Sequence, residues 1–470
     1  MKIYLFISIA VAATLTNNAF ITTLLTTNNN PIILTGSSLQ KELALYNQTA
    51  FRAFNLEITP TNLDRMTNHP INETKVPCKL FIDYNTPQVQ TFADFVVCGY
   101  KGNVGSLLFC FDEYAHNNGE CRKLSLSVEN LVVKKSSLFE RLLFNGIPVD
   151  FSMISERTAF YLMQSFHMIA PMSTHAKLFV NGMYWGLYSF VESVDGHFTK
   201  LRFGDDKSEG KGGLFKDLWL NPLHIANIKK TFKAGSSKKS DMKFIQKVMT
   251  DIVKTPFEGN KPLLLFEKYF DIASLINMTA FNTIIGNTDD WRQRHNFFLY
   301  VKTDSKKQKK IVFIPWDYDR LYDKGNANRG ALQGRPWWDI GATANFFACN
   351  QTISSSEQKA RSIVGGNDIA KINWYKNMFD QLPPDIDIPV TCDKFTQLMA
   401  FALKKRILSR ARYFANHVNL TSLQKQWTTW NNQIMTALVY DKDGPPVSTV
   451  LSEQKLLYQH LSKTISVVLK

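Results

Sequence analysis

Apolar and polar residues alternate along the chain after Val76, whereas they follow helical spacing along much of the later part. Alternation with a period of two residues predicts β-strands that bury one face. The segment 20–75 has no clear period, and we expect it to be loosely structured or to form short helices. The expected strands, each bounded by Gly, Asn or Pro, are residues 79–83, 92–98, 106–110 and 123–128.

The clearest single prediction from this pattern is a β-hairpin. Residues 177–180 and 183–191 are its two strands, and they meet across Asn181-Gly182. Asn and Gly accept the positive φ angles of a type I′ turn, and this turn matches the twist of the flanking strands. Glu192 is expected to end the second strand.

A second hairpin is predicted by two short apolar runs, residues 297–301 and 311–314. The turn between them, residues 302–310, is too polar to be buried. Because a hairpin returns the chain to its starting edge, we expect residues 289–296 and 315–319 to lie close together.

Helical spacing predicts several helices. One is expected at residues 155–168. Asp271 is a suitable N-cap for another, and Gly286 is a suitable residue to end it. The lysine-rich residues 229–242 are expected to be a polar linker or insertion, and residues 325–335 a candidate lid or substrate loop. Further amphipathic helices are expected at residues 394–418, 420–439 and 447–468.

The first residues have the form of a secretory signal peptide. Lys2 is followed by an almost uninterrupted apolar run, residues 3–15, and then by polar and small residues up to Ala19. This run is too short to span a bilayer comfortably, and no later run is long and apolar enough to do so. The C-terminus has no hydrophobic tail of anchor length, so a lipid anchor is not expected. We expect a secreted protein, extracellular or at the cell surface, without a transmembrane segment.

Glycosylation and disulfide bonds are expected in that compartment. Five Asn-x-Thr sequons suggest eukaryotic N-glycosylation; they begin at Asn47, Asn72, Asn277, Asn350 and Asn419. The six cysteines are Cys78, Cys98, Cys110, Cys121, Cys349 and Cys392. An even number predicts disulfides. We expect Cys349 to pair with Cys392, while the first four allow three connectivities, and the C-x-x-C spacing of a zinc site is absent.

Size and charge place few limits on the number of domains and on the class of partner. A chain of 470 residues with 44% hydrophobic residues can form one large domain or two modest ones. The net charge of +15 favours acidic partners. Lysines concentrate at residues 229–243 and 302–310, which are poor in interleaved aromatic residues. We interpret both as solvated insertions and do not expect nucleic-acid binding.

Four polar residues form the strongest candidate for a catalytic site: Asp290, Asn296, Asp317 and Asp319. Phosphoryl transfer needs a divalent cation to neutralise phosphate charge, and Mg²⁺ prefers carboxylate and amide oxygens. It also needs a carboxylate near the acceptor hydroxyl. An Asp…Asn loop and an Asp-x-Asp pair joined by a hairpin are arranged as in enzymes of the protein-kinase type. The alternative interpretation is that these acids are ordinary turn residues.

Several motifs resemble those of the CotH kinase family, kinase-like secreted or spore-coat proteins of bacteria with relatives in fungi and other eukaryotes. They are Phe179-Val180-Asn181-Gly182-Met183-Tyr184-Trp185-Gly186-Leu187-Tyr188 with Glu192, Gly213-Leu214-Phe215-Lys216, Asn287-Thr288-Asp289-Asp290-Trp291 with His295-Asn296-Phe297-Phe298-Leu299-Tyr300, and Phe313-Ile314-Pro315-Trp316-Asp317-Tyr318-Asp319. The resemblance covers roughly residues 95–415. In one departure, residues 101–105 lack the serines that many members carry there. In another, five residues separate Asp290 from Asn296, against four in eukaryotic protein kinases.

The resemblance implies an atypical, reduced protein-kinase fold that uses ATP and Mg²⁺ or Mn²⁺ to phosphorylate serine or threonine in secreted or surface proteins. It implies that Asp290 is the catalytic base, with Asp289 as the alternative. It also implies that Asp317 is the main metal ligand and Asn296 a second one. Asp319 would assist or orient Asp317.

Lys216 and Glu192 are the candidates for the nucleotide side. A kinase-like site needs a cation on the α- and β-phosphates and usually an acid that holds it. Lys216 ends a short strand after a glycine-rich bend, and Glu192 stands where a hinge toward adenine is expected. The alternatives are a strand-end lysine and a solvated glutamate. Lys177 is a second candidate for the phosphate contact.

Strands first and helices later predict an α+β fold with two kinase-like lobes, a β-rich N-terminal part and a helical C-terminal part. The expected divisions are a signal peptide (1–19), a lead-in segment (20–75), a β-rich N-lobe-like part (76–216), a linker or insertion (217–260), and a helical C-lobe-like part with the catalytic loop and metal site (261–470).

Two other functions are considered beside the kinase. A non-catalytic CotH-like surface adhesin or ligand-binding protein would keep the fold without transferring phosphate, and ATP binding with and without Mg²⁺ distinguishes it. A polysaccharide-modifying enzyme would need Asp290 and Asp317 to face a sugar-sized cleft. Neither the acceptor protein nor the oligomeric state is predicted.

Overall fold

The computed structural model describes residues 44–67, 74–102, 124–130, 139–146, 150–203, 212–220, 228–235, 238–287, 290–291, 296–303, 308–319, 321, 394–441 and 444–469. Predictions for the signal peptide, the strand at 106–110, the loop at 325–335 and four of the cysteines lie outside these residues. Two compact units divide the chain. The barrel unit comprises Met1–Arg157, Met172–Ser193 and Asn419–Leu451. The sheet unit comprises Thr158–Pro171, Val194–Val418 and Ser452–Lys470.

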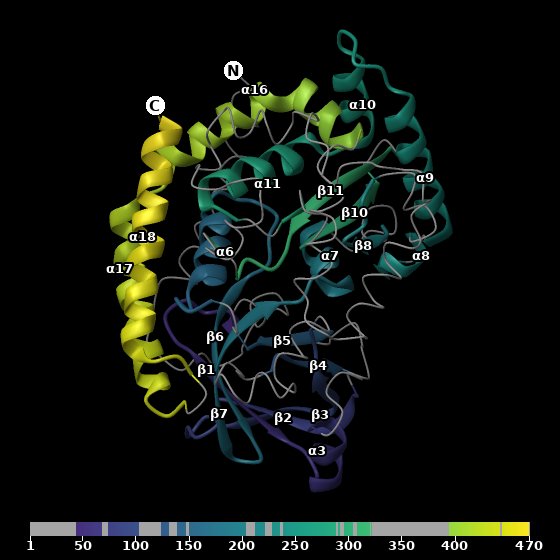
Figure 1. Ribbon diagram of the computed structural model, residues 1–470. Helices are drawn as coiled ribbons and strands as arrows, with labels where there is room; N and C mark the ends of the chain where they lie inside the picture. Colours follow the sequence, from purple (N-terminus) through teal and green to yellow (C-terminus); the bar gives the residue numbers. More distant parts are fainter. Residues whose placement is uncertain are drawn as a thin grey trace, which may run out of the picture. The chain divides into compact units, whose positions relative to one another are not determined.

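In the barrel unit, seven strands close into a barrel in the order β1-β2-β3-β4-β5-β7-β6 (Figure 1). They are β1 (Arg52–Glu57), β2 (Val76–Ile82), β3 (Gln90–Tyr100), β4 (Leu126–Asn130), β5 (Arg141–Asn145), β6 (Ser173–Val180) and β7 (Met183–Glu192). All neighbouring strands are antiparallel except β1 and β6, which pair in parallel and close the barrel. Helices α3 (Pro60–Thr67) and α17 (Leu420–Leu438) belong to this unit.

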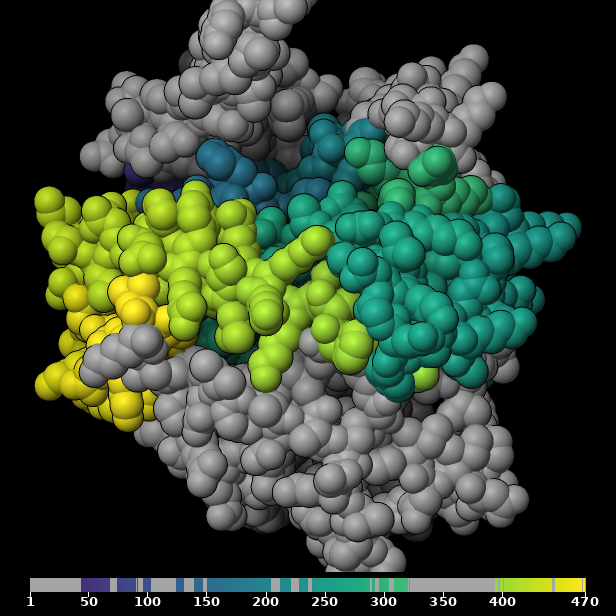
Figure 2. All heavy atoms as spheres, turned by 90° about the horizontal axis from the view of Figure 1, so that it is seen from above, coloured from purple at the N-terminus to yellow at the C-terminus, as the bar shows by residue number. Residues whose placement is uncertain are grey.

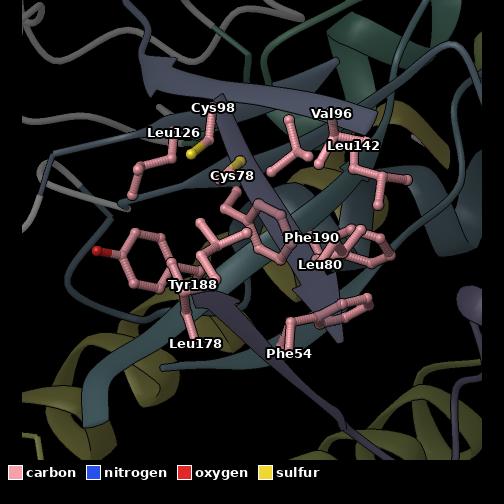
Figure 3. Packing of buried hydrophobic residues seen from close by; sticks show 14 of the residues in the cluster. Phe54, Cys78, Leu80, Val96, Cys98, Leu126, Leu142, Leu178, Tyr188 and Phe190 are labelled. Carbon is pink, nitrogen blue, oxygen red and sulfur yellow. The ribbon is translucent and has the colours of Figure 1, made fainter. Parts of the chain in front are cut away.

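Apolar side chains from all seven strands fill the barrel interior, as Figure 3 shows for Phe54, Leu80 and Phe190 among others. Cys78 and Cys98 lie in this interior as buried free thiols. The hydrogen bond to Cys78, and then burial, raise the pKa of the Cys98 thiol. Because both thiols are free, none of the three connectivities expected among the first four cysteines is present, whereas the Cys349–Cys392 pair stays a prediction.

Strand β1 was not expected in the lead-in segment, whereas α3 is a short helix of the kind that was expected there. Apolar Phe54 and Leu56 alternate with polar Asn55 and Glu57, but Asn55 is buried as well, so the burial in β1 does not alternate. The Asn55 side chain is used in the fold, since its Oδ1 accepts a hydrogen bond from the Gly182 backbone N–H at 3.0 Å.

The β6–β7 hairpin is confirmed, and its turn has the predicted conformation. Asn181 and Gly182 have φ angles of 50° and 79°, both in the left-handed region that a type I′ turn needs. The Asn181 amide also accepts from the Ile58 N–H and donates to the Ile58 carbonyl, each at 2.8 Å. The turn residue thus joins the hairpin to the end of β1.

The sheet unit contains a four-stranded sheet in the order β11-β10-β8-β9. The strands are β8 (Leu214–Lys216), β9 (Phe232–Ala234), β10 (Phe297–Thr303) and β11 (Lys309–Pro315). Antiparallel pairing of β10 with β11 confirms the second predicted hairpin. Both strands extend further into the polar turn than expected, to Thr303 and Lys309.

Helices surround this sheet: α7 (Gly196–Phe203), α8 (Ile228–Thr231), α9 (Lys238–Lys254), α10 (Lys261–Tyr269), α11 (Ile272–Ile285) and α16 (Lys394–His417). Helix α11 packs on β11 and α16 (Figure 1). Figure 2 shows α16 lying beside α9 and α10 on one face. The division between the two units falls inside α6 (Ser155–Ser165) and α18 (Val447–Leu469). Helices were expected near all of α6, α11, α16, α17 and α18.

The ends of α11 agree with the capping prediction. Asp271 is the N-cap, and its Oδ1 accepts from the Ser274 N–H at 2.9 Å. Gly286 follows the helix in the left-handed conformation, with φ of 63°. Both caps satisfy backbone groups that the helix leaves unpaired.

Residues 229–242 were expected to be a polar linker or insertion. An irregular linker is wrong, because α8, β9 and the start of α9 occupy the described residues of this range, and an insertion stays a prediction. Asp241 explains why a charged segment is ordered here, because its buried carboxylate accepts from the Gly213 N–H at 2.7 Å and pairs with the Lys309 ammonium at 2.7 Å.

The glycines before β8 are required by close packing. A Cβ atom on Gly212 would lie 1.8 Å from the carbonyl oxygen of Val301 in β10. The Gly212 N–H donates to the Tyr300 hydroxyl at 3.2 Å, and burial raises the pKa of Tyr300. The glycine-broken stretch therefore lets the chain approach β10 more closely than any side chain would allow.

The overall class is the predicted mixture of strands in the N-terminal part and helices in the C-terminal part. The closed seven-stranded barrel was not predicted, and a two-lobed kinase-like arrangement stays a prediction. Across the described helices, none has both the length and the apolar composition that crossing a membrane requires.

Candidate functional site

One end of the four-stranded sheet brings together two of the predicted polar residues and one that was not predicted. Phe297, the first residue of β10, pairs with Pro315, the last of β11, and Phe298 pairs with Lys216, the last of β8. The residues just beyond these strand ends therefore meet at one edge. They are Asp217, Asn296 and Asp317.

All three of these residues have left-handed backbones. The φ angles are 53° for Asp217, 57° for Asn296 and 58° for Asp317. Non-glycine residues in this conformation are uncommon and cost free energy, and they concentrate at functional sites. Three of them at one strand-end edge are the main geometric sign of a site in this unit.

Backbone hydrogen bonds hold these positions. The Asp217 N–H donates to the Phe297 carbonyl at 3.0 Å, and Asp217 Oδ1 accepts from the Phe297 N–H at 3.3 Å. The Trp316 N–H donates to the Asn296 carbonyl at 3.2 Å. Asn296 is therefore bound to the residue that precedes Asp317, as the hairpin argument predicted.

The predicted metal ligands supply oxygen donors that suit a hard divalent cation. Asn296 is buried, whereas Asp317 and Asp319 are half-buried. Carboxylate and amide oxygens are the donors that Mg²⁺ and Mn²⁺ prefer. Within the described residues, however, no three Asp, Glu, His or Cys side chains are grouped closely enough to hold a metal. The donor chemistry fits the cation, and the ligand set stays a prediction.

Asp290 is almost fully buried, at 1% exposure, and it is held by a neighbour that was not among the predicted site residues. The Asn282 amide Nδ2 donates to Asp290 Oδ2 at 2.6 Å. The Tyr318 hydroxyl in turn donates to Asn282 Oδ1. Trp291, next to Asp290, is buried and stacks on Trp219 with ring centres 6.0 Å apart. These contacts fix the position of the predicted base.

Lys216 lies in the sheet unit and Glu192 in the barrel unit, so neither unit contains both residues. Lys216 ends β8 beside Asp217 and is half-buried. Glu192 ends β7 in the barrel unit, where its Oε2 accepts from the Met172 N–H at 2.9 Å. Their roles toward a nucleotide stay predictions. Lys177 also belongs to the barrel unit, on β6.

Three residues of the site were missed from the sequence: Asp217, Asn282 and Tyr318. For Asn282 a signal existed, because it falls on the apolar stripe formed by Leu275, Met278 and Ile285 of α11. A polar residue in such a stripe needs a buried partner. Asp217 gave no signal beyond its place next to Lys216.

Comparison with known protein families adds one match. The model of the family described as CotH kinase protein matches residues 100–372, more than half of the chain. The chain belongs to the CotH kinase family. The matched range includes the β6–β7 hairpin, β8, and the segments that carry Asp290 and Asp317. Membership supports a kinase and hence a transferase, and a kinase uses ATP and a divalent cation. Comparison with individually curated proteins gives no match.

Proposed function

We propose that this CotH-family chain is a secreted protein kinase that transfers the γ-phosphoryl group of ATP to serine or threonine of secreted or surface proteins. The observation that carries the proposal is the sheet edge, where Asp217, Asn296 and Asp317 have left-handed backbones at three strand ends. Local strain of this kind is kept mainly where a functional geometry requires it. The family match supports the same class of reaction.

In this proposal Asp317 and Asn296 hold Mg²⁺ or Mn²⁺, and Asp319 assists or orients Asp317. The bound cation would neutralise charge on the β- and γ-phosphates. Asp317 follows the end of β11 by two residues and is half-buried, so part of the residue is exposed to solvent. Asp217 adds a further carboxylate at the same edge.

The remaining roles follow from position. Lys216, the residue before Asp217, would bind the α- and β-phosphates as a point charge. Glu192 keeps its proposed role on the adenine side. Asp290 would accept the proton of the acceptor hydroxyl, and its carboxylate is oriented for this by the amide of Asn282.

The direct test is transfer from labelled ATP in the presence and absence of Mg²⁺, measured as autophosphorylation and as transfer to a serine-rich acceptor such as casein. Asp317→Ala is expected to reduce Mg²⁺-dependent transfer by about 10³-fold, the range found when one preorganised electrostatic group is removed from a catalytic site. The melting temperature should change little because Asp317 is half-buried at a strand end.

Asp64→Ala is the matched control, because Asp64 is an exposed aspartate on α3 in the barrel unit. This variant should retain full transfer. Unchanged transfer in Asp317→Ala would sink the assignment of the metal site. ATP binding with Mg²⁺ but no transfer by the wild-type protein would instead favour the non-catalytic adhesin.

A further inference from the structure

A buried chain of hydrogen bonds runs from the predicted base to the predicted metal segment. Asn282, at 0% exposure, stands in the middle of it on α11. Its Nδ2 donates to Asp290 Oδ2 at 2.6 Å, and its Oδ1 accepts from the Tyr318 hydroxyl. Tyr318 is the residue between Asp317 and Asp319. One side chain thus contacts both halves of the candidate site.

The chemistry of the two partners fixes which way the Asn282 amide faces. An ionised carboxylate only accepts hydrogen bonds, so Asp290 requires the NH₂ group of the amide. The amide oxygen then faces Tyr318, which must donate. Because each bond sets the orientation for the other, loss of the Tyr318 hydroxyl would also loosen the contact to Asp290.

The support on which Asn282 stands is rigid. Helix α11 is capped at both ends, by the Asp271 side chain and by left-handed Gly286, and it packs on β11 and α16. Tyr318 is buried at 1% exposure, and its ring lies 5.5 Å from that of Phe160. A side chain fixed in this way can hold a carboxylate to within a fraction of an ångström, which catalysis requires.

We propose that Asn282 is a positioning residue that orients Asp290 and couples it to the metal-bearing segment through Tyr318. The inference rests on the proposed kinase function for its catalytic consequence. Its mechanical part, the coupling of the two segments, does not depend on that function. A displacement of Asp317–Asp319 would then displace Asp290, and a displacement of Asp290 would displace Asp317–Asp319.

Four variants of the full-length protein test this. Asn282→Ala removes both hydrogen bonds, and Asn282→Asp preserves the size and the acceptor for Tyr318 but replaces the NH₂ donor by a second carboxyl group beside Asp290. Tyr318→Phe removes only the hydroxyl. Thr279→Val is the control, because Thr279 is a buried polar residue of the same helix. Its hydroxyl donates to the Leu275 carbonyl of α11 at 2.8 Å.

Two readouts are needed. In phosphoryl transfer, both Asn282 variants should lower kcat by about 10²-fold with the KM for ATP changed less than about twofold, since misplacement of a catalytic group by about 1 Å has an effect of this size. Tyr318→Phe should lower kcat by about tenfold. Thr279→Val should leave kcat unchanged even where its melting temperature falls. Equal kcat values in the wild type and both Asn282 variants would overturn the proposal.

The second readout is hydrogen–deuterium exchange without nucleotide, followed in peptides that contain Asp290–Trp291 and Trp316–Asp319. Coupling predicts faster exchange in both peptides for Asn282→Ala and for Tyr318→Phe, and no change for Thr279→Val. If Tyr318→Phe affects only its own peptide, the coupling is wrong. If the wild-type protein transfers no phosphate, the proposed function fails, and the exchange data still decide whether Asn282 joins the two segments.

Discussion

The barrel unit and the sheet unit each contain a buried polar network, and the two networks end differently. In the barrel unit, fully buried Arg157 donates to Gln48 Oε1 at 2.9 Å and to the Gln48 carbonyl at 2.8 Å, and it lies 3.0 Å from His175 Nδ1. Its guanidinium also stacks 4.1 Å from the ring centre of Trp430. His175 Nε2 lies 2.7 Å from the Met153 carbonyl, to which it donates while Nδ1 accepts from Arg157. Burial lowers the pKa of the guanidinium.

The network of the sheet unit is shorter, and it leads toward the site instead of back into the core. Asn282 joins Asp290 to Tyr318, and Tyr318 is flanked by the half-buried Asp317 and Asp319. The barrel network joins distant segments of its unit to backbone carbonyls, so its main effect should be on stability. The sheet network orients side chains at a strained strand-end edge, so its main effect should be on activity. Substitutions in the two networks should therefore separate these two quantities.

The largest effect on stability is expected from Arg157→Ala. This substitution removes the donor to Gln48 Oε1, to the Gln48 carbonyl and to His175 Nδ1, and it opens a cavity beside Trp430. Unsatisfied buried polar groups and a cavity together should lower the free energy of unfolding by about 3–5 kcal/mol. Chemical denaturation followed by circular dichroism measures the change.

Arg141→Ala is the matched control, because Arg141 lies on β5 of the same unit and forms an exposed ion pair with Glu129 at 2.7 Å. An exposed pair contributes less than about 1 kcal/mol. If Arg157→Ala is no more destabilising than this control, the barrel network does not have the stabilising role inferred for it.

A smaller effect on stability is expected in the sheet unit from Gly212→Ala. The new Cβ would lie 1.8 Å from the Val301 carbonyl oxygen, so β8 must move away from β10, at about 2–3 kcal/mol. Gly259→Ala is a control without steric overlap, because nothing lies within 4 Å of the added atom, although its φ of 49° adds a backbone cost that Gly212 does not have. That control should lose only about 1 kcal/mol. Equal losses, measured by the same denaturation, would show that close packing at Gly212 is not the limiting factor.

This pair of glycine variants also sharpens the comparison, because β8 carries Lys216 and leads into Asp217. Movement of β8 should reduce phosphoryl transfer as well as stability. In Arg157→Ala, by contrast, the molecules that stay folded should transfer phosphate at the wild-type rate, since no residue proposed for catalysis contacts Arg157 among its described partners.

Features set by local chemistry could be predicted from the sequence. The Asn181-Gly182 turn and the caps Asp271 and Gly286 each depend on residues within one hairpin or one helix, and all three are confirmed. The hairpin argument also correctly joined Asn296 to the strand that leads to Asp317. In each case the deciding interaction spans few residues or follows from strand pairing between neighbours in sequence.

Features set by distant contacts could not be predicted. Strand β1 was missed because its apolar run is short and because the contacts that order it, the pairing with β6 and the bond between Asn55 and Gly182, come from far along the chain. The start of α9 has the composition of a polar linker. Its order depends on the contacts of Asp241 with Gly213 and Lys309, which belong to other segments of the chain. For the same reason Asn282 was missed, since its role depends on partners in two other segments. The roles of Asp290, Asp317 and the other candidate residues stay predictions.

The smallest expected effect concerns glycosylation, and it compares one sequon from each unit. Asn419, in the barrel unit, is exposed and is the N-cap of α17. Its Oδ1 accepts from the Ser422 N–H at 2.9 Å, so a glycan on Nδ2 would leave the cap intact. Asn277, in the sheet unit, is half-buried on α11, and its Oδ1 accepts from the Arg410 guanidinium at 2.7 Å. A glycan there would interfere with the packing of α11 on α16.

If the protein is expressed through the secretory pathway of a eukaryotic host, we expect a glycan at Asn419 and none at Asn277, as measured by glycopeptide mass spectrometry. Thr421→Ala should remove the Asn419 glycan without touching the cap, because Thr421 is exposed, and stability should change by less than about 0.5 kcal/mol. Asn419→Gln also removes the glycan but loses the cap bond, and it should cost about 1 kcal/mol. A glycan on Asn277 in folded protein would contradict the close packing of α11, and with it the rigid support on which the positioning of Asp290 by Asn282 depends.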